Sequence, residues 1–135
     1  MKVAIRYFTR TGNTEKLAKA ISEALNVAAE TVSRPLEEKA DILFLGSSVY
    51  AAGVDDEIKE FLRNNKDKIG TLVNFSTAAL LPSTYNQVKK LAEALSIEVS
   101  DKEFHCRGSF AMLHKDRPNS ADIEAAAAFA KSVVS

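Results

Sequence analysis

The segment of this chain best suited to chemistry is a short polar loop near its start, Thr9-Arg10-Thr11-Gly12-Asn13-Thr14. It follows an apolar run typical of a buried strand and precedes apolar residues at helical spacing. Backbone N–H groups at a helix start have no intrahelical acceptor, and the helix dipole adds partial positive charge there. Hydroxyl and amide side chains supply further donors, and Gly12 permits a backbone conformation that other residues rarely adopt. The segment therefore predicts a phosphate-binding loop.

Other interpretations of this loop are limited by its spacing. A Walker A loop ends in Gly-Lys-Ser/Thr, whereas Gly12 is followed here by Asn13 and Thr14. A dinucleotide fingerprint needs three spaced glycines, and this loop has one. A monophosphate is therefore favoured over a triphosphate or a pyrophosphate. An ordinary helix cap by Thr11 or Asn13 is the alternative that stays open.

Two further segments could border a flat ligand. The first follows the apolar run 41–46 and surrounds one aromatic with small and polar residues: Ser47, Ser48, Val49, Tyr50, Ala51 and Gly53. Tyr50 could stack on an aromatic ligand, and packing over the next helix is its alternative role. The second segment follows the apolar run 70–75 and offers backbone and hydroxyl groups: Ser76, Thr77, Ala78 and Ala79.

The elements that must position these segments alternate along the chain. Apolar runs predict strands at about 2–8, 27–33, 41–46 and 70–75, with a broken fifth strand at 97–99 and 104–106. Helical spacing predicts a helix over 13–25 and three further helices, which are capped by Asp55 or Asp56, by Ser83, and by Asn119 or Ser120. This alternation predicts an α/β fold, a doubly wound three-layer α/β/α sandwich with a five-stranded parallel sheet in the order 2-1-3-4-5. The segments after strands one, three and four would then converge on one site.

The loop at 9–14, placed after the first strand, resembles the phosphate-binding loop of the flavodoxins, and the similarity continues through residues 15–18. Residues 41–50 resemble the third strand of that family and the loop beside its flavin. The resemblance implies flavin mononucleotide (FMN) as cofactor, at the switch point between the first and third strands, for which flavodoxin is itself the reference example. It also implies that Tyr50 flanks the flavin ring, and that the protein is an electron carrier or a small flavin-dependent reductase.

The chain departs from that family in its charge. Lys and Arg number 18 and Asp and Glu number 18, so the formal net charge is zero, whereas shuttle flavodoxins are strongly acidic. The segment 76–81 also lacks the acidic residues and second aromatic that the family often has there. Carboxylates near the flavin repel its anionic reduced form, and this chain has fewer of them. We therefore expect a less negative reduction potential than in shuttle flavodoxins. A noncatalytic flavodoxin-like binding or regulatory domain that has lost its cofactor is the alternative function.

Composition narrows the remaining classes. The chain of 135 residues suits a single domain, 1–135, and its zero net charge argues against nucleic acid as a partner. No apolar run is long enough for a membrane span, and the absence of a signal peptide gives a cytoplasmic location as the default. The single Cys106 excludes an internal disulfide and a cysteine-based metal site. We expect a monomer or weak dimer that meets a redox partner protein or a small-molecule electron acceptor.

Two basic features have open interpretations. Arg10 is unusual beside a phosphate, and projection of its side chain into solvent is one interpretation. Residues 107–118 are locally basic through His114, Lys115 and Arg117, and could form a lid beside the ring or an ordinary solvated loop.

Overall fold

A parallel sheet forms the middle of the molecule. The computed structural model describes residues 1–10, 12–49, 54–78, 83–107 and 117–135. The strands are β1 (Val3–Tyr7), β2 (Ala29–Thr31), β3 (Ala40–Val49), β4 (Ile69–Ala78), β5 (Glu98–Val99) and β6 (Phe104–Arg107). Their order is β2-β1-β3-β4-β5, and β6 also pairs with β4. All these pairs are parallel. The predicted order 2-1-3-4-5 is confirmed. The predicted broken fifth strand corresponds to two strands, β5 and β6, each of which pairs with β4.

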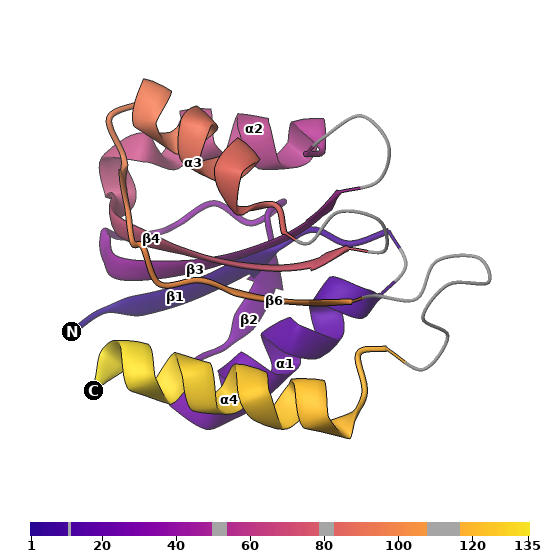
Figure 1. Cartoon of the computed structure of the whole chain (residues 1–135). Helices are drawn as coiled ribbons and strands as arrows, with labels where there is room; N and C mark the ends of the chain where they lie inside the picture. The colour runs from indigo at the N-terminus through magenta and orange to yellow at the C-terminus, as the bar shows by residue number, and fades with distance from the viewer. Residues whose placement is uncertain (11, 50–53, 79–82, 108–116) are drawn as a thin grey trace.

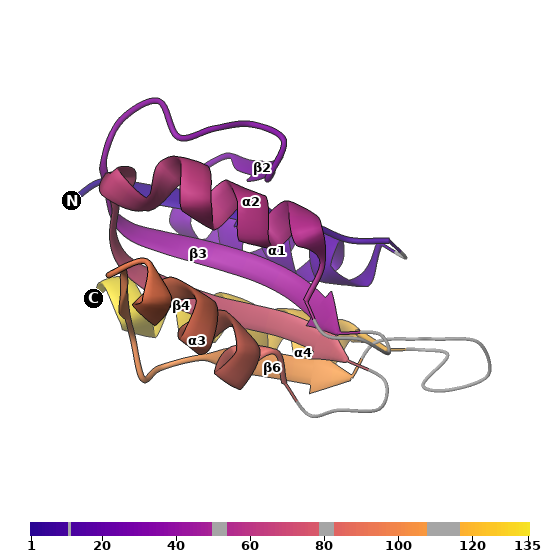
Figure 2. The same cartoon turned by 90° about the horizontal axis from the view of Figure 1, so that it is seen from above.

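Helices cover both faces of the sheet. They are α1 (Asn13–Leu25), α2 (Asp56–Asn65), α3 (Tyr85–Ala94) and α4 (Ser120–Val134), with a short 3-10 turn, η1 (Lys66–Lys68), after α2. Figures 1 and 2 show α1 and α4 on one face and α2 and α3 on the other. The carboxyl ends of β1, β3 and β4 lie at the edge opposite the two chain termini (Figure 1). The three strands that precede the predicted site segments therefore end at the same edge of the sheet.

The apolar run in β3 explains why this strand lies at the centre. Successive side chains of a strand point to opposite faces, so a strand covered on both faces is apolar throughout. Phe44 packs in the cluster under α1 and α4, whereas Leu43 and Leu45 pack in the cluster under α2 and α3. All three are fully buried.

The two central strands are longer than the sequence predicted. Their parallel register continues through the pairs Ser47↔Ser76, Ser48↔Thr77 and Val49↔Ala78. These residues were expected in loops, so that prediction was wrong. The apolar pattern ends before the strands do. The last strand residues are buried serines and threonines, which the interior accepts because their hydroxyl groups find hydrogen-bond partners there.

The helix starts show similar small differences. The N-cap of α3 is Thr84 instead of Ser83, although Ser83 Oγ still accepts a bond of 3.0 Å from the backbone N–H of Tyr85. The predicted cap Asn119 is confirmed for α4, where it forms a reciprocal capping box with Asp122. None of the helices within the described ranges is long and apolar enough to cross a membrane.

Candidate functional site

The turn from β1 into α1 depends on one glycine. Gly12 occupies the N-cap position with φ 87° and ψ −2°, in the left-handed region that favours glycine. Its N–H donates to Thr9 Oγ1 at 2.9 Å, which closes the turn. The N-cap residue is a glycine and so has no side chain to cap the helix, and Asn13 is the first residue of α1 instead of its N-cap. Thr11, the other predicted cap, lies outside the described residues. A helix start behind a glycine suits an anion, because its first N–H groups have no intrahelical acceptor.

Thr14 fastens this turn to the sheet. Its side chain is fully buried, and Oγ1 lies 3.3 Å from the Ser47 carbonyl, 3.2 Å from Ser48 Oγ and 3.0 Å from Thr77 Oγ1. A threonine hydroxyl has one proton and two acceptor positions. The carbonyl can only accept, so Thr14 donates to Ser47, and the hydroxyls of Ser48 and Thr77 donate to Thr14. This network uses the one donor and both acceptor positions of the Thr14 hydroxyl, and it joins the first turn of α1 to β3 and β4.

Gly46 makes room for this attachment. A Cβ at position 46 would lie 2.4 Å from the Phe75 ring and 2.9 Å from the Thr14 methyl carbon. Real Cβ atoms do not approach other carbons so closely, so with any larger residue the Phe75 ring, and to a lesser degree Thr14 at the start of α1, would have to move. The glycine that ends the apolar part of β3 thus allows Phe75 and the first turn of α1 to pack against this strand.

The other polar residues of these strands face the opposite layer. Ser47 Oγ donates to Thr84 Oγ1 at 2.9 Å, and Asn74 Nδ2 donates to the same oxygen at 3.0 Å. Ser76 Oγ accepts from the Thr84 N–H at 3.3 Å. Strand alternation therefore divides the predicted residues: Ser48 and Thr77 face α1, whereas Ser47 and Ser76 face α3. The two that face α3 have their hydroxyls inside the protein, which leaves main-chain groups for any ligand at the strand ends.

An ion pair crosses from the phosphate loop to α2. Arg10 Nε and Nη2 lie 3.0 Å and 2.5 Å from Asp55 Oδ1. The Arg10 side chain is 62% exposed, whereas that of Asp55 is only 7% exposed. Projection of Arg10 into solvent is therefore an incomplete description, because its head group is held by a buried carboxylate. Asp55 is the N-cap residue of α2 but makes no side-chain cap bond, contrary to its predicted role. Nothing local in the sequence marks this pair.

Several predicted site residues cannot be placed in this way. Thr11, Tyr50, Ala51, Gly53 and Ala79 lie outside the described residues, as does most of the basic segment 107–118. Val49 and Ala78 are the last residues of β3 and β4. The predicted stacking of Tyr50 on a ring thus stays a prediction.

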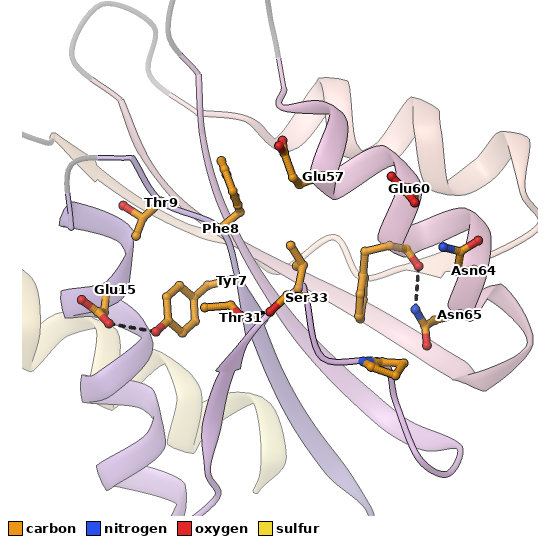
Figure 3. Close-up of a pocket in the computed structure, with 13 residues that line it drawn as sticks. Tyr7, Phe8, Thr9, Glu15, Thr31, Ser33, Glu57, Glu60, Asn64 and Asn65 are labelled. Carbon is orange, nitrogen blue, oxygen red and sulfur yellow. Dashed lines mark hydrogen bonds between the residues drawn. The ribbon is translucent and has the colours of Figure 1, made fainter.

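A cavity of about 620 Å³ lies beside the loop, shares Thr9 with it, and extends between the end of β1, the chain after β2, and α2 (Figure 3). Its lining includes the carboxylates Glu15, Glu57 and Glu60 and no lysine or arginine. Glu15 accepts a bond of 2.9 Å from the Tyr7 hydroxyl, and burial, followed by this bond, raises the pKa of Tyr7. Carboxylates repel a phosphate, whereas the loop 9–14 carries one arginine and no acid. The loop, and not this cavity, suits a phosphate.

The other reactive side chains in the described ranges, Cys106 and His105, support no other chemistry. Burial raises the pKa of the Cys106 thiol to about 12, so it is protonated at neutral pH and packs as a small apolar residue. His105 is exposed and bonds Glu103 at 2.7 Å. Within the described part of the chain, no group of three His, Cys, Asp or Glu side chains could hold a metal ion.

Comparisons with known proteins agree with this geometry. A family model described as a flavodoxin domain matches residues 4–115. An uncharacterized protein of Methanocaldococcus jannaschii is 30% identical in an alignment of 136 positions, gaps included, and 90% of each protein is covered. The structure of a flavodoxin from the domain Archaea matches with a TM-score of 0.80 at 15% identity, covering 98% of this chain and 96% of that one. Rubredoxin oxygen:oxidoreductase from Desulfovibrio gigas matches with a TM-score of 0.76 at 15% identity, covering 98% of this chain but 35% of that one.

At such identities the structural matches establish the fold alone. The family model, however, spans most of the sequence, including the phosphate loop, β3 and β4. This chain therefore belongs to the flavodoxin family.

Proposed function

We propose that this protein binds FMN at the carboxyl edge of β1, β3 and β4 and transfers electrons, as a carrier or as a small flavin-dependent reductase. The observation that carries the proposal is the N-terminus of α1 directly behind a left-handed Gly12, in a loop with one cation and no carboxylate. Such a helix start suits a phosphate monoester. The donor set fits the group, because backbone N–H, hydroxyl and guanidinium groups all donate to phosphate oxygens.

The proposed roles combine the predictions from the sequence with the hydrogen bonds of Thr14. Residues 9–14 hold the phosphate, with Thr14 contributing its backbone N–H because its hydroxyl is already bonded to β3 and β4. The ends of β3 and β4, with the segments that follow them, border the ring, and Tyr50 stacks on one of its faces. The bound flavin supplies the redox chemistry, so the chain needs no catalytic acid or base.

The choice of cofactor can be tested by titrating apoprotein with FMN, flavin adenine dinucleotide and riboflavin, followed by flavin fluorescence. We expect the tightest binding for FMN, because the loop is compact and the sequence has no further glycine-rich segment for a pyrophosphate. Riboflavin, which lacks the phosphate, should bind less tightly. Equal or tighter binding of the dinucleotide would contradict the assignment.

The same titration tests the alternative function. A protein that is purified without visible flavin absorbance, and whose apoprotein binds none of the three compounds, would be the noncatalytic domain considered above. Absorbance of freshly purified protein in the visible range is the quicker first measurement, because oxidised flavin is yellow.

A further inference from the structure

We infer that Arg10 and Asp55 form a brace that joins the phosphate side of the site to its ring side and holds both in the geometry that FMN needs. The inference rests on the proposed binding of FMN. Arg10 belongs to the loop after β1, whereas Asp55 directly precedes α2 and closes the connection from β3. The bond thus links the connection after β1, which is proposed to bind the phosphate, to the connection after β3, which is proposed to border the flavin ring.

The position of Asp55 indicates that this bond is its main role. Asp is among the favoured N-cap residues, and the backbone of Asp55, with φ −62° and ψ 149°, is extended as a capping residue requires. Its carboxylate nevertheless makes no bond to the first turn of α2 and accepts two from Arg10. The next two residues, Asp56 and Glu57, already place negative charge at the start of α2. Asp55 is therefore directed toward the phosphate loop.

In an alternative role, the pair would exist only in the apoprotein. Asp55 would bind Arg10 until the phosphate of FMN replaced it as the partner of the guanidinium. The burial of the two partners argues against this. Asp55 is 7% exposed, so departure of Arg10 would leave a buried carboxylate without its partner cation. Arg10 is 62% exposed, so its guanidinium can lie beside a phosphate while it stays bonded to Asp55. We therefore expect the pair to persist when FMN is bound.

The two roles predict opposite results for Asp55→Asn. If the pair is a brace, the substitution loosens one side of the site from the other, and FMN and riboflavin both bind more weakly, on the order of tenfold. If Asp55 competes with the phosphate, its removal releases Arg10, and FMN binds more tightly while riboflavin is unchanged. The sign of the FMN effect separates the roles.

The experiment compares wild type, Arg10→Gln, Asp55→Asn and the double variant as apoproteins titrated with each flavin. If the pair is a brace, each single variant binds both flavins less tightly than wild type. The double variant should bind no less tightly than the single variant with the lower affinity. Arg10→Lys should bind more tightly than Arg10→Gln. Asp56→Asn is the matched control, because it removes the same charge one residue away, where the side chain is 95% exposed and faces Lys59 at 3.7 Å. Arg34→Gln is the control for Arg10, since its side chain is 70% exposed.

Thermal unfolding of the apoproteins completes the test. Variants that lose stability but keep both affinities would make the pair a purely structural contact and overturn the inference, as would tighter FMN binding by Asp55→Asn. A wild-type protein that binds neither flavin would instead refute the proposed function, and the brace with it. Failure of the brace alone is thus distinguishable, because wild type would still bind FMN.

Discussion

Thr14 is the residue whose role the structure changes most. Its type and place in the loop predict a hydroxyl donor to phosphate. Its burial and its three hydrogen-bond partners describe a side chain that attaches α1 to the sheet. A hydroxyl with its proton and both acceptor positions in use has no further bond to offer. A phosphate would therefore meet the backbone N–H of this residue, in a position that the hydroxyl fixes.

This interpretation makes Thr14→Val informative, because valine keeps the shape and removes the hydroxyl. We expect a loss of about 1–3 kcal/mol in the free energy of unfolding of the apoprotein, since the Ser47 carbonyl and two hydroxyls lose a buried partner. Urea unfolding measures this loss. Thr14→Ser, which keeps the hydroxyl, should recover most of it.

Flavin titration of the same variants distinguishes the two roles of Thr14. An attachment role predicts that Thr14→Val weakens FMN and riboflavin alike. A direct bond from the hydroxyl to phosphate would instead cost on the order of 1.5–3 kcal/mol of FMN binding and leave riboflavin nearly unchanged. That second pattern, with an unchanged stability of the apoprotein, would restore the role predicted from the sequence.

At the scale of helices and strands, the sequence predicts those elements whose positions are determined by a local pattern of apolar residues. The unbroken apolar run in β3 and the helical spacing after Asn13 are visible in the sequence, because burial on both faces or on one face selects residue types. The extension of β3 and β4 was missed, because a buried serine or threonine in a strand looks like a loop residue until its partner is known. The pair Arg10 and Asp55 was missed because only the folded chain brings these residues together.

The start of α4 makes a prediction about pH. Asp122 accepts bonds from Arg117 at 2.6 Å and from the Asn119 N–H at 2.8 Å. The bond from Arg117, more than the cap, holds the pKa of Asp122 below its ordinary value. A carboxylate with a lower pKa in the folded state stabilises the fold above its unfolded pKa of about 3.9 and loses this contribution as the pH falls through the folded value.

We therefore expect Asp122→Asn to lower the thermal stability at neutral pH and to remove part of the acid sensitivity of the wild type. The difference in melting temperature between the two proteins should shrink as the pH is lowered below about 4, because the wild-type carboxylate is then protonated as well. Melting curves at a series of pH values measure this. A difference that stays constant down to strongly acidic pH would contradict the assignment. Glu124→Gln on the same helix, at an exposed position, is a control for the removed charge.

At the scale of the whole molecule, the distribution of charge bears on the potential of a bound flavin. The formal net charge is zero, and the carboxylates that follow the ring-side connection are partly neutralised. Asp55 pairs with Arg10, and Asp56 lies 3.7 Å from Lys59. Negative charge near a flavin disfavours its anionic reduced form, and such charge is screened less when it is buried than when it is exposed. Asp55, the buried carboxylate of the two, is the one whose Oδ1 accepts two bonds from an arginine.

We therefore predict that the more negative of the two one-electron couples of bound FMN lies above that of strongly acidic flavodoxins. Spectroelectrochemical titration reports both couples, and each tenfold change in relative affinity for two redox states corresponds to about 1.4 kcal/mol. Asp56→Asn and Glu57→Gln should shift this couple little, because both side chains are exposed to solvent. Arg10→Gln should lower it, because the substitution leaves the buried Asp55 charge without its cation. A couple as negative as in acidic flavodoxins would show that charge at these connections does not control the potential, and would favour the shuttle role over the reductase role.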